Sequence, residues 1–351
     1  MNFDSMKLSS VTHRLKYYYD RLLAPETDWI QIEVSSHCNA SCSYCPRTVY
    51  REAWKSRHLP LAIFRNLLPA MANTGLVFLQ GWGEPFLNPD IFTMITMARK
   101  TGSRVGTTTN GMLLNKSRIE RLIDCGIDLI SFSMAGLDEK NDAFRKGTNL
   151  QKVLDTIRAF QLEKEKRNLS RPSLHVSYLL LRSGLGDIAK LPDVLCGLGI
   201  DQVVISTLDF IPVAELEEEA LCPGSMVEYN RLRSVLDNVK NAAGVKGLPV
   251  YYNLAMKNGP RKICSENPQR SFYVASDGSV SPCVFTNPPV SNVPRRFHGE
   301  NLPWERLVFG NVEHDSVSYI WQKKEYIAFR KSFDTERLNH ICRNCYKLYV
   351  G

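Results

Sequence analysis

The sequence lacks any apolar run long enough to cross a membrane, which takes about 20 consecutive residues. Residues 1–25 also lack a signal-peptide pattern, because charged residues interrupt their apolar stretch and no small-residue cleavage site follows. We therefore expect no membrane partner, and we predict a cytoplasmic protein.

A concentration of charge is missing as well. The 44 basic and 36 acidic residues give a net charge of +8, but they are dispersed along the chain. No compact patch of basic and aromatic residues stands out, so we expect no nucleic-acid partner. The chain has no internal repeat or low-complexity tract, which argues against a repeat architecture. Apolar residues make up 44% of the chain, enough for a substantial core.

Ten cysteines in 351 residues do not make a small secreted disulfide scaffold, and their clustering indicates metal binding. The first cluster follows a predicted strand in which Ile30, Ile32 and Val34 alternate with polar residues. Three cysteines come next, spaced C-x-x-x-C-x-x-C: Cys38, Cys42 and Cys45. Three thiolates can hold three corners of a cubane iron–sulfur cluster and leave the fourth iron open. A zinc knuckle with His37 as fourth ligand, or a redox C-x-x-C, are the alternatives.

The chain between residues 29 and 245 alternates predicted strands with predicted helices. After the first strand, the strands are expected at residues 76–80, 104–109, 128–134, 174–181 and 202–208. The helices are expected at residues 61–71, 91–99, 116–125, 150–166, 188–198 and 226–242. Six such alternations predict an α/β fold with a parallel sheet and right-handed crossovers. Residues 1–28 are predicted to be a helical lead-in that ends at Pro25, and residues 211–225 a linker or lid.

The C-x-x-x-C-x-x-C motif after a first strand resembles the signature of radical S-adenosylmethionine (radical SAM) enzymes. The resemblance implies a partial (β/α)6 barrel and a 4Fe–4S cluster whose open iron chelates SAM. Reduction of that cluster then cleaves SAM to a 5′-deoxyadenosyl radical. In the family, the aromatic residue before the third cysteine, here Tyr44, lies beside the cofactor.

Other positions resemble the family's SAM-binding motifs. Gly83 and Glu84 match the end of a Gly-Gly-Glu motif that binds the SAM amino group, whereas Trp82 stands where the family has its first glycine. Asn110 matches a Thr-Asn-Gly motif at the end of the third strand. Ser133 and Arg145 fit the positions that bind the SAM carboxylate, and a guanidinium suits that task. Relatives with an auxiliary-cluster domain usually have an aspartate two residues after this serine, where this chain has Ala135. The task of that aspartate stays unassigned.

The C-terminal part carries a second set of cysteines around a predicted β-hairpin with an Asp-Gly turn and a predicted helix at residues 317–332. This arrangement resembles the SPASM/twitch domains of radical SAM enzymes, small α+β domains that carry auxiliary clusters. The four cysteines are Cys264, Cys283, Cys342 and Cys345. Their thiols are enough for one complete 4Fe–4S cluster, and a zinc site is the alternative. We place this domain at residues 246–351, after a barrel at residues 29–245.

Three cysteines remain. Cys125 and Cys196 adjoin glycines at helix ends and are expected to be buried core thiols, whereas the role of Cys222 is undetermined.

The resemblance implies an oxidoreductase or maturase that abstracts hydrogen from a small-molecule or peptide substrate, with one auxiliary cluster assisting oxidation. A flavodoxin- or ferredoxin-type protein would be the reductant. No leader-binding domain is recognised, which slightly favours a small molecule. The alternatives are a peptide maturase that cross-links or epimerises, a non-enzymatic iron–sulfur or zinc scaffold, and an activase of a glycyl-radical enzyme. The last is disfavoured because the chain lacks ferredoxin-like insertions near the first motif.

Overall fold

The computed structural model describes residues 15–256, 264–335 and 337–348. In these ranges, no helix combines the length and the apolar character that a membrane crossing requires. Residues 15–23 are helical and end before Pro25, as predicted for that part of the lead-in, whereas residues 1–14 lie outside the described ranges.

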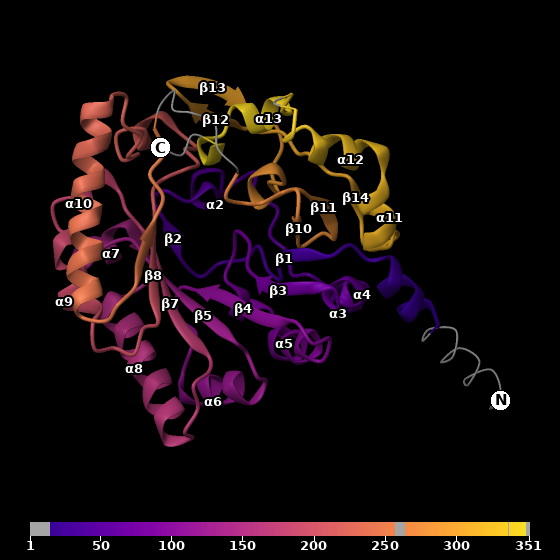
Figure 1. The fold of residues 1–351 in the computed structure, drawn as a ribbon, viewed down its shortest axis with the longest axis horizontal. Helices are drawn as coiled ribbons and strands as arrows, with labels where there is room; N and C mark the ends of the chain where they lie inside the picture. Colours follow the sequence, from indigo (N-terminus) through magenta and orange to yellow (C-terminus); the bar gives the residue numbers. More distant parts are fainter. Residues whose placement is uncertain (1–14, 257–263, 336, 349–351) are drawn as a thin grey trace.

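One ten-stranded sheet forms the centre of the molecule, in the order β14-β11-β10-β1-β3-β4-β5-β7-β8-β9 (Figure 1). Every pairing from β1 to β9 in that order is parallel. These seven strands are β1 (Thr27–Ile32), β3 (Thr74–Leu79), β4 (Arg104–Thr109), β5 (Leu129–Met134), β7 (Ser173–Leu179), β8 (Gln202–Ser206) and β9 (Val250–Tyr252). The first six are the strands that the sequence predicted, so the parallel α/β fold class is confirmed.

Helices cover the outer face of this sheet (Figure 1). They are α5 (Ile91–Arg99), α6 (Lys116–Asp124), α8 (Leu150–Lys166), α9 (Leu191–Leu195) and α10 (Met226–Val245). Asparagine or serine side chains cap α6, α8 and α10 at their N-termini, which satisfies exposed backbone N–H groups. On β5, Phe132 faces outward and its ring lies 6.0 Å from that of Phe160 on α8, whereas Ser131 and Ser133 lie on the inner face.

Three predicted helices are interrupted. Residues 61–71 form α3 (Leu61–Arg65) and α4 (Leu68–Met71), because Pro69 cannot continue α3. In residues 188–198, a 3₁₀ turn (Ile188–Lys190) precedes α9, whose first turn contains Pro192. Residues 317–332 form α11 (Val317–Gln322) and α12 (Lys324–Lys331), separated by Lys323 in an extended conformation.

The predicted C-terminal hairpin forms and extends the barrel sheet. β10 (Ser271–Val274) and β11 (Ser279–Ser281) pair antiparallel across the Asp277-Gly278 turn, where Gly278 has a φ of +80°. β10 pairs in parallel with β1, and β11 pairs with β14 (Gly310–Asn311). The C-terminal region is therefore fixed beside the strand that carries the first cysteine loop.

The other C-terminal elements lie over the edge of the sheet at which its parallel strands end (Figure 1). They are the hairpin β12 (Pro294–Phe297) and β13 (Glu300–Pro303), α13 (His340–Arg343), and the 3₁₀ turns at Val284–Thr286 and Tyr346–Leu348. The segment expected to be a linker or lid, residues 211–225, contains one 3₁₀ turn, Ala214–Leu216. It is attached to β12, since Arg296 donates its N–H to the Ile211 carbonyl across 2.7 Å and pairs with Glu217.

Candidate active site

The first cysteine loop follows β1 directly. Its middle forms a short strand, β2 (Ser41–Cys42), that pairs antiparallel with β6 (Arg145–Lys146). Cys45 precedes the short helix α2 (Pro46–Val49), and its N–H donates to the Cys42 carbonyl across 3.1 Å. The β2–β6 pairing and this tight turn hold the thiols of Cys38, Cys42 and Cys45 at the carboxyl end of β1.

The thiols of this loop lie close enough to influence one another. Burial raises the pKa of Cys38, and burial together with the neighbouring Cys42 thiol raises the pKa of Cys45 to about 12. Such thiols are protonated at neutral pH, so a bound metal must displace their protons.

The loop after β3 crosses closely over the cysteine loop. A Cβ atom on Gly83 would lie 2.3 Å from the His37 carbonyl oxygen, and one on Gly81 would lie 2.4 Å from the Glu33 side chain. The Glu84 N–H donates to the His37 carbonyl across 2.7 Å. Both glycines are therefore required by the close approach of two loops, which together shape the site.

Glu84 joins this loop to the end of β4. Its buried carboxylate accepts hydrogen bonds from the Asn110 N–H and from the Thr109 hydroxyl, both across 2.8 Å. Asn110 in turn donates its side-chain amide to Asn39 and lies 3.9 Å from the Cys38 sulfur. Burial raises the pKa of Glu84. Its predicted contact with the SAM amino group stays a prediction, and what the structure shows is that Glu84 orders the residues around Cys38.

Arg145 is a buried cation at the same place. One guanidinium nitrogen donates to the Tyr44 hydroxyl across 2.6 Å, and the buried Nε atom has no hydrogen-bond partner among the described residues. Burial lowers the pKa of Arg145, but the nearby Tyr44 hydroxyl and Cys42 thiol outweigh this effect and raise the pKa overall. Ser133 lies half-buried near the end of β5, at the same edge of the sheet. A guanidinium with unused donors in a buried place suits an anionic ligand.

The C-terminal cysteines are brought together. All four, Cys264, Cys283, Cys342 and Cys345, line a single cavity. Burial raises the pKa of Cys264 to about 12, with a further contribution from the Cys345 thiol. Cys283 has a pKa well above its usual value for the same reason.

The number of thiols in this cavity suits a cluster. Thiolates are the usual ligands of iron–sulfur clusters, and the four thiols that line the cavity are enough to complete one 4Fe–4S cluster.

Charged side chains also line the cluster cavity. Lys347 is placed between two carboxylates, with its ammonium 3.0 Å from Asp209 and 3.3 Å from Glu266. Arg295 lines the cavity as well and donates to the backbone carbonyl of Asn344 across 2.5 Å.

Trp82, which departs from the family's glycine, packs between the two sites. Its ring centroid lies 5.8 Å from that of Phe285 and 5.9 Å from that of Phe210, and both phenylalanines line the cluster cavity. Trp54 and Trp304 complete this aromatic group. The substitution thus replaces a flexible glycine with a contact between the barrel and the C-terminal region.

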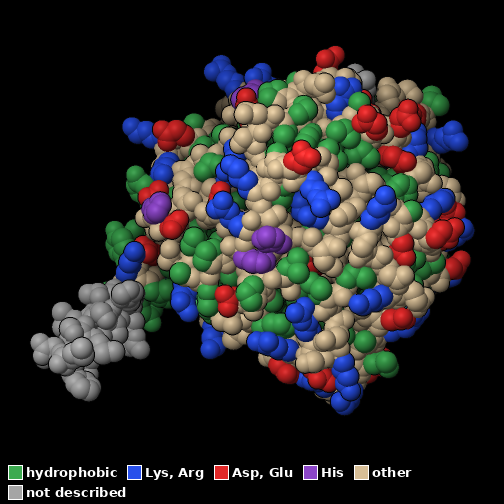
Figure 2. Space-filling model, turned by 180° about the vertical axis from the view of Figure 1, so that it is seen from behind, with side chains coloured by type: hydrophobic (Ala, Val, Ile, Leu, Met, Phe, Trp, Pro, Cys, Tyr) green, Lys and Arg blue, Asp and Glu red, His purple; other side chains and the backbone are tan. Residues whose placement is uncertain are grey.

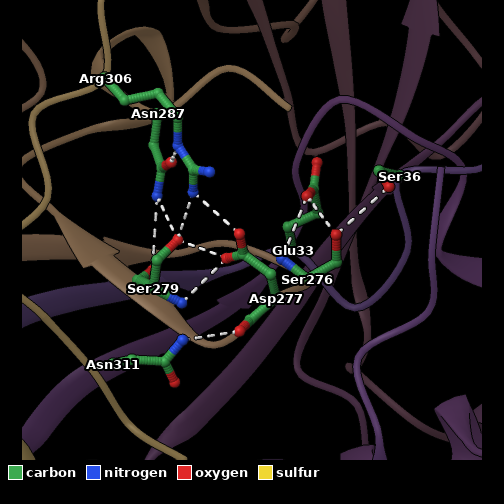
Figure 3. Close-up of polar contacts among 8 residues, drawn as sticks. All are labelled: Glu33, Ser36, Ser276, Asp277, Ser279, Asn287, Arg306 and Asn311. Carbon is green, nitrogen blue, oxygen red and sulfur yellow. Dashed lines mark hydrogen bonds and ion pairs between the residues drawn. The ribbon is translucent and has the colours of Figure 1, made fainter. Parts of the chain in front are cut away.

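Glu33, which was not among the residues predicted from the sequence, connects three parts of the site. Its buried carboxylate accepts hydrogen bonds from the Trp82 N–H and from the N–H and hydroxyl of Ser276, and the Ser276 hydroxyl also contacts that of Ser36. Burial raises the pKa of Glu33. Figure 3 shows Ser276, at the hairpin turn, directed toward Glu33 and Ser36 on the barrel side. The available signal was an acidic residue inside a strand between Ile32 and Val34.

The other half of the network in Figure 3 fixes the hairpin turn itself. Asp277 accepts hydrogen bonds from Ser279 and forms an ion pair with Arg306 at 2.9 Å, while Arg306 also donates to Asn287. Asn311 donates to the Asp277 carbonyl. These contacts order the turn that presents Ser276 to Glu33.

The remaining cysteines lie outside both sets. Cys125 and Cys196 are partly buried and pack against the main core, rather than lying fully inside it. Cys222 packs against the small apolar cluster that also contacts Tyr44 and contains Tyr346.

Two family models match the chain. The model of the radical SAM superfamily matches residues 32–165, which contain the first cysteine loop and Arg145. The chain belongs to the radical SAM superfamily. A model of an iron–sulfur cluster-binding domain, SPASM, matches residues 264–346 and spans all four C-terminal cysteines. The resemblance drawn from the motifs is confirmed.

Two known proteins are similar to this chain over most of their length. A tungsten-containing aldehyde ferredoxin oxidoreductase cofactor-modifying protein of Pyrococcus furiosus is 23% identical over 90% of this chain and 86% of its own. A PqqA peptide cyclase of Gluconobacter oxydans is 25% identical over 89% of this chain and 81% of its own.

Solved structures share the fold. SuiB of Streptococcus suis bound to S-adenosylmethionine has a TM-score of 0.62 at 15% identity, covering 99% of this chain and 78% of that one. The structure of anSMEcpe with bound AdoMet and a Cp18Cys peptide has a TM-score of 0.64 at 17% identity, covering 93% and 88%.

These matches confirm the predicted cofactor classes. As a radical SAM protein with a SPASM domain, the chain uses a 4Fe–4S cluster with SAM and an auxiliary iron–sulfur cluster. It is a radical SAM enzyme, and its chemistry is SAM-dependent radical chemistry.

Proposed function

We propose that this enzyme oxidises its substrate by hydrogen-atom abstraction, with SAM at the first cysteine loop and one auxiliary 4Fe–4S cluster in the C-terminal cavity. Cys38, Cys42 and Cys45 would hold the first cluster, which with SAM would supply the 5′-deoxyadenosyl radical that takes the hydrogen atom. Cys264, Cys283, Cys342 and Cys345 would hold the auxiliary cluster, which would provide an acceptor for the electron lost, together with a proton to solvent, when the substrate radical is oxidised.

The observation that carries the proposal is the buried Arg145 guanidinium beside the three thiols. Its Nε atom has no partner among the described residues, and its bonded partner, Tyr44, carries no charge at neutral pH because burial raises the pKa of its hydroxyl. Leaving a buried charge without a partner is costly, so the site is built for an anion. In our proposal Arg145 and Ser133 bind the SAM carboxylate, and the loop of Gly83 and Glu84 binds its amino end.

The remaining residues of the first site position these groups. Asn110 holds Asn39 next to Cys38, and Glu84 holds Asn110 through its backbone N–H. The two glycines of the second loop allow it to lie directly on the cysteine loop. In this way the SAM-binding loops and the cluster-binding loop form one unit.

An oxidoreductase needs an electron acceptor, and the second cavity supplies the place for one. Its four thiols are sufficient to close a 4Fe–4S cluster, so no iron would be open to substrate. Trp82 and Phe285 connect the first site to this cavity through aromatic contacts. A non-enzymatic scaffold would require neither the Arg145 site nor this connection.

For the substrate, we propose a peptide in preference to a small molecule. The PqqA peptide cyclases and the structure with a bound Cp18Cys peptide support this choice. The small-molecule alternative is supported by the cofactor-modifying relative and by an AdoMet-dependent heme synthase of Methanosarcina barkeri, which is 23% identical over 89% of this chain.

We also propose a flavodoxin- or ferredoxin-type reductant, because the cluster must receive one electron before SAM is cleaved. We propose a cytoplasmic location, because free thiols persist in reducing compartments. On the face in Figure 2, basic and acidic side chains are interspersed without a continuous patch of one sign.

The test is anaerobic turnover of the reconstituted enzyme with SAM and dithionite. We expect formation of 5′-deoxyadenosine by the parent and by Cys125→Ala, whose thiol lies outside both sets, and none by Cys42→Ala. Undiminished cleavage in Cys42→Ala would contradict the assignment of the first site. Adding a peptide fraction or a small-molecule fraction of cell extract then distinguishes the substrate classes by the mass of the product.

A further inference from the structure

The Arg295 side chain is buried in the wall of the cluster cavity. Arg295 belongs to β12, is 9% exposed and lines the same cavity as the four C-terminal thiols. Its guanidinium donates hydrogen bonds to the backbone carbonyls of Asn344 and Ile341, across 2.5 and 3.3 Å.

These two carbonyls belong to the residues that immediately precede the thiols of the C-x-x-C turn. Ile341 precedes Cys342, and Asn344 precedes Cys345. The two hydrogen bonds therefore fix the guanidinium relative to both thiols of the turn at once.

The charge of Arg295 is not balanced by a carboxylate. Among the residues that the structure describes, no acidic side chain forms an ion pair with it, whereas Lys347 in the same cavity has two, Asp209 and Glu266. The next residue, Arg296, pairs with Glu217 at 2.9 Å. A buried guanidinium whose partners are neutral carbonyls keeps its full charge available to a neighbouring anion.

We propose that Arg295 is a positioning residue for the auxiliary cluster, which orients the C-x-x-C turn and raises the reduction potential of the cluster by offsetting its negative charge. The inference rests on the proposed function, in which the four thiols hold a 4Fe–4S cluster. One added electron makes a thiolate-ligated cluster more negative by one charge. A fixed cation nearby stabilises the reduced form more than the oxidised form, and net charge around a cluster is a known determinant of its potential. The same cation adapts the cluster to accept an electron from substrate.

The test is a redox titration with dithionite, followed by electron paramagnetic resonance, in the full-length protein with Cys38, Cys42 and Cys45 changed to alanine. Only the auxiliary cluster then contributes to the signal. We expect Arg295→Gln and Arg295→Met to lower the midpoint potential. Arg295→Lys, which keeps the charge, should retain most of the parental value. Arg296→Gln is the matched control, because Arg296 is paired and does not line the cavity, and it should leave the potential unchanged.

Iron content separates failure of this inference from failure of the proposed function. If the parental background itself holds no iron, the proposed cluster is absent and the proposed function fails. If the neutral variants hold the cluster at the parental potential, the role of Arg295 is wrong. Loss of iron from both neutral variants but not from Arg295→Lys supports the charge requirement, whereas loss from all three would reduce Arg295 to a structural hydrogen-bond donor and overturn the proposal.

Discussion

Arg145 and Tyr44 form a buried pair, with the guanidinium donating to the phenolic hydroxyl across 2.6 Å. The pair joins the residue before the third cysteine to a residue of β6, which itself pairs with Cys42. The cation is thereby held next to the cluster-binding loop, and its Nε atom has no hydrogen-bond partner in the described part of the chain.

Arg145→Ala should weaken SAM binding by about 1.5–3 kcal/mol, the range for a hydrogen bond to a charged group. Anaerobic titration calorimetry of the reconstituted enzyme measures this change. Arg145→Lys keeps the charge but loses the planar fork of donors, so its affinity should fall between those of the parent and the alanine variant. An unchanged dissociation constant in Arg145→Ala would remove Arg145 from the SAM site.

Tyr44→Phe should weaken SAM binding by about three- to tenfold, because Arg145 loses the contact that orients it. The same titration measures the effect. Tyr252→Phe is the matched control, since Tyr252 donates its hydroxyl to Asp237 on α10 and its loss should leave SAM affinity unchanged. Equal affinities in Tyr44→Phe and the parent would show that Arg145 is oriented without Tyr44.

Ser276→Ala should lower the free energy of unfolding by about 1–2 kcal/mol, because a buried carboxylate oxygen of Glu33 loses one of its donors. Denaturant unfolding of the iron-free protein measures this change. Ser318→Ala should cost less, because the hydrogen bond of the buried Ser318 hydroxyl within the described ranges is with the neutral hydroxyl of Ser316. If Ser276→Ala lowers the free energy of unfolding no more than Ser318→Ala does, the hydrogen bond from the hairpin to Glu33 does not stabilise the fold.

Local spacing was sufficient to predict both cysteine sets and most of the sheet. The motif at Cys38, Cys42 and Cys45 lies in one short loop, so its spacing is visible in the sequence. Buried side chains alternate with less buried ones along β1, at Ile30 and Ile32, and along β7, and this alternation is the sequence pattern of a strand with one buried face. The helix breaks near Pro69 and Pro192 agree with proline chemistry, but the apolar periodicity continues across both positions and by itself predicts unbroken helices.

Long-range pairing was not predictable from local pattern. The parallel alignment of Phe272 with Ile30 joins segments about 240 residues apart, and nothing in either strand specifies that neighbour. The roles of Glu33 and Arg295 follow from this alignment and from the fold of the C-terminal region, because their partners are distant residues or backbone carbonyls. Such contacts become visible only in three dimensions.

The iron-free protein should lose stability as the pH rises above 9. The thiols of Cys45 and Cys264 have an ordinary pKa of 9.0, and burial raises each to about 12 in the folded protein. Because the unfolded chain ionises first, their contribution to stability is complete below pH 9 and is lost as the pH rises toward 12. Thermal unfolding between pH 7 and pH 10.5 measures the loss. The Cys45→Ala/Cys264→Ala double variant should lose less above pH 9, and identical pH profiles for the two proteins would contradict the account.

The most direct test of two separate cluster sites is the metal content of the protein with Cys38, Cys42 and Cys45 changed to alanine. We expect about eight irons per chain in the reconstituted parent and about four in this variant, since a 4Fe–4S cluster holds four. The electron paramagnetic resonance signal of the reduced variant should not change when SAM is added, because four thiolates leave no iron open. A variant that holds zinc and no iron would contradict the account and make the C-terminal cavity a structural metal site.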